Sequence, residues 1–292
     1  MCRFIFLYKC KNTQDKLFEF LHKQFVRHDA IESGYGIAWY KDKTWNTYKS
    51  TTIFTKDPNF ADVIKEAQSN ILICHIRYIV HMPQLKYKKE HAVENSHPFY
   101  HKDYAFVHHG DLFYTPLNGD LLRYQDGRHD SKFKPIIQKL KSHIDPSFTK
   151  NMKGNTDSET MFYLALTAEK ELHKLEGIPK AKIFLYSFIK MLQIIDYYSM
   201  ENISNFFFAS KEYIIVANIL KKTPTNDRDK LDLYFSKDRS GGIVLTSMKI
   251  NKSSKQVNAN EMYFIHISSG SLHHYKLPNL VTFYGGAANG FK

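Results

Sequence analysis

The order of the apolar segments is the feature that most constrains this fold. Strand-like runs, including "RFIFLY" (3–8) and "ILICHIRYIV" (71–80), come first, and two helical patterns follow at 157–172 and 181–198. Strand-like runs then return, beginning with "NFFFASKEYIIVANIL" (205–220). This grouping predicts an α+β fold in which sheet packs on sheet with helices outside, because a doubly wound sheet would alternate strand and helix.

Shorter patterns predict the remaining elements. Residues 15–25 and 59–69 have helical spacing, and the glycine-containing segment 34–50 predicts a hairpin whose turn lies at Lys41 to Lys43. The segment "YAFVHHGDL" (104–112) is expected to be a strand that runs into a glycine turn. Asp157, or a neighbour, is expected to cap the helix that starts there.

Length and composition predict one domain. The chain has 292 residues, of which 43% are hydrophobic, so it can bury a real core. The sequence shows no internal repeat and no low-complexity linker. We therefore expect a single domain over 2–277, followed by a flexible tail over 278–292.

Charge and hydropathy argue against nucleic-acid and membrane proteins. The net charge of +12 comes mostly from dispersed lysines, and the basic run "KYKKEH" (86–91) is short and contains a glutamate. A solvated loop explains that run, and no nucleic-acid-binding motif accompanies it. The long apolar stretch over 181–200 is interrupted by Lys190 and Gln193, which predicts a buried amphipathic helix in place of a membrane span.

The position of one cysteine raises a question about function. There are three cysteines, Cys2, Cys10 and Cys74, and no apolar signal sequence, which predicts a cytoplasmic protein without a disulfide framework. Cys2 alone could be a small apolar residue at the edge of a core. Removal of Met1, however, would expose an α-amine of pKa about 7.7–8.0 beside the thiol. Such an amine can act as base to the nucleophile of its own residue.

The histidines invite a metal interpretation that their spacing does not support. His91, His97, His101, His108 and His109 match no compact zinc signature, and no cysteine pair accompanies them. We therefore expect no metal at these residues.

Four segments, taken in order, resemble the class II glutamine amidotransferases. They are "MCRF" at the start, "CHIRY" around Arg77, "ENSHPF…YAFVHHGDL" between Glu94 and Leu112, and "GNTDSETMF" from Gly154. The resemblance covers roughly residues 1–277 and is greatest to the stand-alone, γ-glutamyl amidohydrolase-like branch. It implies the fold of the N-terminal-nucleophile hydrolases, a four-layer αββα sandwich of two mostly antiparallel sheets with helices outside.

The resemblance also implies roles for five residues. Cys2 would be the nucleophile, Arg77 would bind the substrate's α-carboxylate, and Asp157 would bind its α-ammonium group. The family usually has Asn-Gly in the oxyanion hole, where this chain has His109 and Gly110. Gly110 can still donate its backbone N–H, and a neutral His109 could donate from one ring nitrogen.

Two functions are compatible with these residues. The first is a cytoplasmic amidohydrolase that cleaves glutamine or another γ-glutamyl amide through a Cys2 thioester. Its partner would be a small-molecule substrate, with no cofactor, nucleic acid or membrane, and any ammonia acceptor or protein partner is unidentified. The second is a pseudoenzyme that keeps the pocket and binds γ-glutamyl ligands or a protein partner without efficient turnover. The substitution of His109 for asparagine favours the second, whereas Cys2, Arg77 and Asp157 favour the first.

Overall fold

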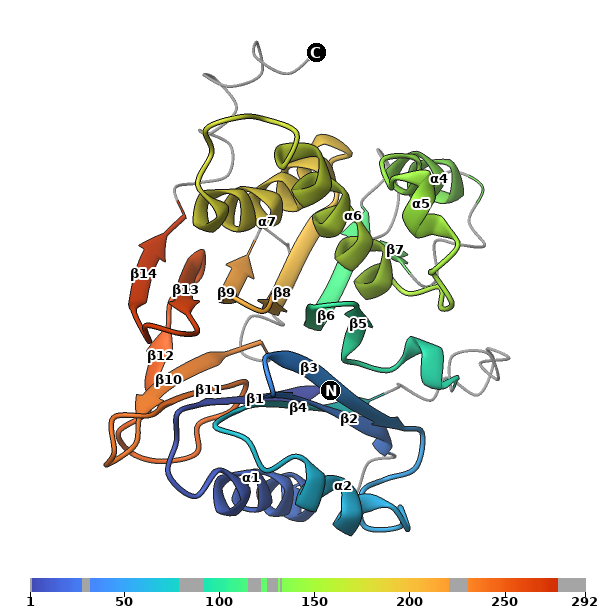
Figure 1. The fold of residues 1–292 in the computed structure, drawn as a ribbon. Helices are drawn as coiled ribbons and strands as arrows, with labels where there is room; N and C mark the ends of the chain where they lie inside the picture. Colours follow the sequence, from blue (N-terminus) through green and yellow to red (C-terminus); the bar gives the residue numbers. More distant parts are fainter. Residues whose placement is uncertain are drawn as a thin grey trace.

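The protein is a sandwich of two antiparallel sheets covered by helices on both outer faces (Figure 1). The computed structural model describes residues 2–27, 32–78, 92–114, 122–124, 131, 133–220 and 231–277. The layers follow the order helix, sheet, sheet, helix, which confirms the predicted α+β class and αββα architecture. Residues 278–292 lie outside the described residues, so the predicted flexible tail stays a prediction.

The first sheet contains the start of the chain and has the strand order β12-β10-β11-β1-β4-β2-β3. Its strands are β1 (Arg3–Tyr8), β2 (Glu32–Lys41), β3 (Thr44–Ser50), β4 (Ile71–Tyr78), β10 (Leu233–Lys237), β11 (Ile243–Thr246) and β12 (Lys255–Val257). Helices α1 (Thr13–Arg27) and α2 (Phe60–Glu66) cover its outer face. The β2–β3 turn lies at Asp42 and Lys43, which have φ angles of 53° and 63°, as a tight two-residue hairpin requires. The predicted hairpin is therefore confirmed.

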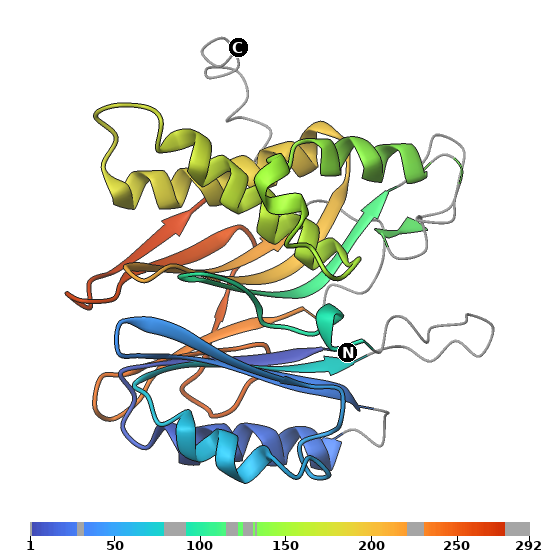
Figure 2. The same ribbon diagram turned by 45° about the vertical axis from the view of Figure 1, so that its right-hand side comes forward.

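The second sheet has the order β14-β13-β9-β8-β6-β5, and β7 pairs with β6. Its strands are β5 (Phe99–His101), β6 (Tyr104–Tyr114), β7 (Leu122–Arg123), β8 (Glu201–Ala209), β9 (Tyr213–Leu220), β13 (Glu261–His266) and β14 (Leu272–Lys276). A short 3-10 helix, η2 (Val93–Asn95), precedes β5. The outer face of the second sheet carries α4 (Phe133–Ser142), α5 (Pro146–Thr149), α6 (Asp157–Leu172) and α7 (Lys180–Tyr197) (Figure 2).

Alternation along β1 explains why its sequence is apolar on both faces. Ile5 and Leu7 belong to the core between the first sheet and its helices, whereas Phe4, Phe6 and Tyr8 belong to the core between the two sheets. A strand covered on both sides loses the usual alternation of apolar and polar residues. The apolar core between the two sheets therefore includes Phe4, close to the start of the chain.

The two long helices differ in how much of their surface they bury. All residues of α6 from Asp157 to Glu169 are buried, because α6 packs on the second sheet and on α7. Helix α7 buries one stripe and leaves Tyr186 and Tyr197 exposed, so the predicted amphipathic helix is confirmed. No helix among the described residues is long and apolar enough to cross a membrane.

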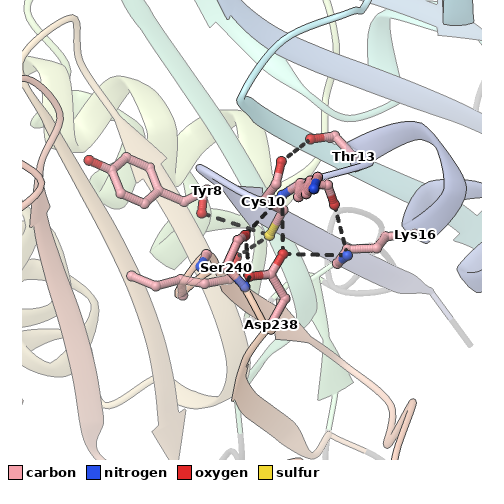
Figure 3. Close-up of polar contacts among 9 residues, drawn as sticks. Tyr8, Cys10, Thr13, Lys16, Asp238 and Ser240 are labelled. Carbon is pink, nitrogen blue, oxygen red and sulfur yellow. Dashed lines mark hydrogen bonds and ion pairs between the residues drawn. The ribbon is translucent and has the colours of Figure 1, made fainter.

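A half-buried carboxylate joins the end of β1 to the β10–β11 turn (Figure 3). Asp238 accepts hydrogen bonds from the backbone N–H groups of Lys11 (3.1 Å) and Gly242 (2.8 Å), and its carboxylate pairs with Lys16 at 3.4 Å. The backbone and hydroxyl of Ser240 also donate to it. Burial raises the pKa of Asp238, but these hydrogen bonds outweigh burial and hold the pKa at about 2.

One predicted turn is absent. Strand β6 continues through Gly110 to Tyr114 and pairs with β8 along its length, so the predicted glycine turn is wrong. The glycine serves close packing instead: a Cβ on Gly110 would lie 2.1 Å from the Ile203 carbonyl oxygen of β8. Sequence analysis also did not predict α4 and α5, and it extended α2 beyond its end at Glu66.

Candidate active site

Cys2 immediately precedes β1 and lies on the inner face of the first sheet. Strand β1 pairs with β4 so that Arg3 is opposite Ile76 and Phe4 is opposite His75. One further step of this register places Cys2 opposite Arg77. Since alternate residues of a strand share a face, Cys2 lies on the side of Phe4, toward the second sheet. Two of the predicted site residues therefore come together on neighbouring strands.

Arg77 lies in a buried environment that contains other charges. It is 8% exposed and shares a face of β4 with His75 and Ile73, the latter part of the inter-sheet core. Burial lowers the pKa of Lys49, the carboxylates of Glu159 and Glu94 raise it, and the positive charge of Arg77 lowers it. This end of the sandwich therefore contains charges of both signs, with Arg77 among the cations.

His109 approaches the start of β1 from the second sheet. Its ring meets the Phe4 ring edge-on, with centroids 6.2 Å apart. His109 is 1% exposed, and burial, aided by the charge of Arg3, lowers its pKa well below the usual value. The imidazole is therefore neutral, with one N–H donor, and neither ring nitrogen bonds to a described residue.

The backbone at Gly110 can lie close to β8 because glycine has no side chain. Gly110 pairs with Ser204 of β8 and has a φ angle of 155°. A Cβ here would lie 2.1 Å from the oxygen of Ile203 and 2.7 Å from Oγ of Ser204. Glycine is required at this position because no other residue fits so near the neighbouring strand.

Asp157 begins α6 and is joined to β6. The cap is Thr156, whose side chain accepts a hydrogen bond from the N–H of Glu159, so a neighbour of Asp157 caps the helix, as the sequence allowed. Asp157 accepts a 3.0 Å bond at Oδ2 from the N–H of Leu112, two residues beyond Gly110. It is 2% exposed. The connection of Asp157 to the other predicted site residues thus runs through β6.

The three thiols have different environments. Cys2 is half-buried, whereas Cys10 and Cys74 are buried, and none forms a disulfide. Burial raises the pKa of Cys10 to about 12 and also raises that of Cys74. Buried thiols that stay protonated are poor nucleophiles. The two buried cysteines are therefore unsuited to the chemistry considered for Cys2.

One buried polar residue near the site, His75, was not singled out from the sequence. The rings of His75 and His97 lie 4.3 Å apart, and burial lowers the pKa of both. Gly36 on β2 allows the backbone of His97 to lie close to β2, because a Cβ on Gly36 would be 2.0 Å from the carbonyl oxygen of His97. His75 precedes Arg77 by two residues, so the period of a strand already places both on one face. The two-residue spacing of His75 and Arg77 could therefore have identified His75 as a neighbour of the site from the sequence.

The histidines considered as metal ligands are dispersed. His101 packs on Phe148 and Tyr163, His108 bonds to serines on the helix side of the sheet, and His109 lies between the sheets. Within the described parts of the chain, no three side chains of His, Cys, Asp or Glu converge as a metal site would require. His91 lies outside the described residues.

Comparison with known proteins identifies the family of this chain. The sequence profile of the class-II glutamine amidotransferases matches residues 1–173 of this chain. The chain therefore belongs to the class II glutamine amidotransferases. No curated protein matches the sequence significantly.

Solved structures share the fold at low sequence identity. A glutamine aminotransferase class-II domain protein from Silicibacter pomeroyi is 16% identical with a TM-score of 0.59, and the match covers 94% of this chain and 99% of that one. Glutamine phosphoribosylpyrophosphate amidotransferase from B. subtilis is 13% identical with a TM-score of 0.60, covering 96% of this chain and 50% of the other. An allosteric regulatory enzyme of purine biosynthesis is 13% identical with a TM-score of 0.62, covering 96% and 49%. This chain thus spans about half the length of the last two.

Proposed function

We propose that this protein is an amidohydrolase that cleaves a γ-glutamyl amide, glutamine or a related compound, through a thioester on Cys2. The observation that supports the proposal is the register of β1 and β4, which pairs Arg3 with Ile76, so that one further step along both segments puts Cys2 opposite Arg77. A nucleophile beside a buried guanidinium suits a substrate with a free carboxylate, because the planar fork of arginine binds carboxylates in two places.

The chemistry begins with removal of Met1. The new α-amine of Cys2, with a pKa of about 7.7–8.0, takes the proton of the thiol, and the thiolate attacks the γ-carbonyl carbon. The C–S bond forms first and the carbonyl oxygen becomes the oxyanion of a tetrahedral intermediate. The intermediate collapses to the thioester as the C–N bond breaks, and the leaving amine receives the proton from the α-ammonium group of Cys2. Water then attacks the thioester, giving glutamate and restoring the thiol.

The remaining residues would bind the substrate and stabilise the developing charge. Arg77 takes the α-carboxylate and Asp157 the α-ammonium group, so the pair selects a free γ-glutamyl end. The backbone N–H of Gly110 donates to the oxyanion. The neutral ring of His109 donates where most relatives use an asparagine amide, and the low pKa of His109 leaves that ring neutral across the physiological range.

The test is covalent labelling of the mature protein. A γ-glutamyl chloroketone should label Cys2 alone, and mass spectrometry should show that the labelled chain starts at Cys2. Cys10 and Cys74 are internal controls, because burial keeps both thiols protonated. Retention of Met1 in hydrolytically active protein, or label on either control cysteine, would exclude this mechanism.

His109 supports a second candidate, a pseudoenzyme that binds γ-glutamyl ligands without efficient turnover. An imidazole is bulkier than an amide, and removing one oxyanion donor costs roughly a hundredfold to a thousandfold in rate. If His109 is a working donor, His109→Ala should lower glutamate release about a hundredfold with little change in binding. If it has abolished turnover, wild type should be nearly inactive and His109→Asn should restore activity. Substantial wild-type turnover that neither variant changes would place His109 outside the oxyanion hole.

A further inference from the structure

His108 bridges the two parts of the candidate site from the opposite side of the second sheet. It precedes His109 on β6, so its side chain points away from Cys2 and toward α6. Its Nδ1 lies 2.9 Å from Oγ of Ser158 on α6, and its Nε2 lies 2.6 Å from Oγ of Ser204 on β8. The ring also stacks on Phe206 at 5.1 Å, which leaves it one orientation.

Each serine partner of His108 is linked to a different predicted site residue: Ser158 is hydrogen-bonded to Asp157, and Ser204 is paired with Gly110 in the β6–β8 register. The N–H of Ser158 donates to Oδ1 of Asp157 at 2.7 Å, and its hydroxyl lies 3.3 Å from the same oxygen. On the other side, Oγ of Ser204 lies 2.7 Å from the point where a Cβ on Gly110 would be. The bridge therefore runs from Asp157 through Ser158, His108 and Ser204 to Gly110.

The bridge is dry and neutral. His108 is 2% exposed, Ser158 4% and Ser204 0%. Burial lowers the pKa of His108 to about 4, although the Asp157 carboxylate raises it. A neutral imidazole donates from one nitrogen and accepts at the other, so both serine contacts can be satisfied together. The hydroxyl of Ser204 donates to Oδ1 of Asn202, so Nε2 of His108 donates to Ser204 and Nδ1 of His108 accepts from Ser158. Buried hydrogen bonds of this kind restrict the geometry of the groups they join.

We infer that His108 is a positioning residue that holds Asp157 and Gly110 in one fixed arrangement through Ser158 and Ser204. The inference rests on the proposed function, in which Asp157 binds the substrate's ammonium group and Gly110 donates to the oxyanion. His108 touches neither substrate nor the reacting atoms. It acts because a displacement of about 1 Å at a catalytic group costs up to about a hundredfold in rate.

Two substitutions separate the two ends of the bridge. The amide of His108→Asn falls near the Nδ1 position and keeps a partner for Ser158, whereas the longer His108→Gln reaches the Nε2 position and keeps a partner for Ser204. His108→Asn should therefore lower kcat by about tenfold or more with KM nearly unchanged. His108→Gln should raise KM by about tenfold or more with kcat nearly unchanged.

Substitution of the two serine partners tests the same two changes in kcat and KM independently. Ser204→Ala should reproduce the loss in kcat, and Ser158→Ala should reproduce the rise in KM. Ser187→Ala is the matched control, because Ser187 is fully buried on α7 and donates only to the carbonyl of Phe184 among the described residues. It should leave both constants unchanged. A purely structural role for His108 would instead lower stability and leave kcat and KM of the folded fraction unchanged in both variants.

Measurements on the wild-type protein distinguish failure of the proposed function from failure of the proposed role of His108. Glutamate release from γ-glutamyl amides and calorimetric binding of glutamate are measured for all variants. If wild type hydrolyses or binds these ligands and the Asn and Gln variants behave alike, the bridge inference is wrong and the proposed function stands. For an inactive wild type, the Gln variant should still bind glutamate more weakly than the Asn variant. Wild type that neither binds nor hydrolyses overturns the proposed function and the inference with it.

Discussion

The substitution Gly110→Ala tests whether β6 and β8 are as close as the structure places them. The added Cβ would lie 2.1 Å from the carbonyl oxygen of Ile203, 2.7 Å from Oγ of Ser204 and 2.8 Å from Cα of Ser204. Ordinary carbon–oxygen contacts between strands are about 3.3–3.6 Å. Two of the three obstructing atoms belong to the backbone, so a side-chain rotation cannot relieve the clash. The strands would have to separate by roughly 1 Å.

The expected cost has two parts. Overfilling a packed site typically costs about 1–3 kcal/mol. The φ angle of 155° adds strain for a residue with a Cβ, and such backbone strain costs about 1–3 kcal/mol. We therefore expect Gly110→Ala to lower the free energy of unfolding by about 2–6 kcal/mol. If the proposed function holds, the displaced N–H should also reduce turnover by up to about a hundredfold.

Gly177→Ala is the matched control. Gly177 also has a positive φ angle, 78°, but a Cβ there would meet nothing within 4 Å. Its loss of stability therefore reports backbone strain without the contact. Urea unfolding of both variants and wild type should show Gly110→Ala less stable than Gly177→Ala by at least about 1 kcal/mol, the contact cost alone. Equal destabilisation by the two substitutions would refute the close approach of β6 to β8.

The remaining predictions concern substrate binding by Arg77 and Asp157, and the hydrogen bonds that Asp238 accepts at the end of β1. Arg77→Lys and Asp157→Asn should each weaken γ-glutamyl binding by roughly 1.5–3 kcal/mol in calorimetry while the fold is retained, because each loses a charge-assisted contact; unchanged binding in both would exclude the assigned roles. Asp238→Asn should be less stable than wild type at neutral pH. The folded-state pKa of Asp238, about 2, is below the ordinary value of 3.8, so its stabilisation should be present above about pH 4 and decline as pH falls toward 2. Unfolding measured between pH 2 and pH 7 should show the two curves converge at the acid end, and a constant difference would show that the ionised carboxylate is not the stabilising group.

Much of the fold could be predicted because local patterns and their order were consistent. The apolar run of β1, the tight turn at Asp42 and Lys43 and the buried stripe of α7 are properties of short segments. The helices over 133–149 were not predicted, although the buried residues of α4, Phe133, Ile137 and Leu140, have helical spacing and a proline in the first turn is a helix-start signal. Gly110 was misinterpreted because a glycine required for contact with another strand resembles a glycine required for a turn.

The sequence by itself determined the family and the candidate residues, because the four motifs and the cysteine at position 2 are features of the chain order. The roles of Cys2, Arg77, Asp157, His109 and Gly110 stay predictions. Only the tertiary structure decided which residues face one another. The register of β1 and β4 places Cys2 opposite Arg77, and strand alternation sends His108 toward α6 and His109 between the sheets. Such pairings join segments far apart in the chain, and they arise from the packing of whole sheets, which no local pattern records.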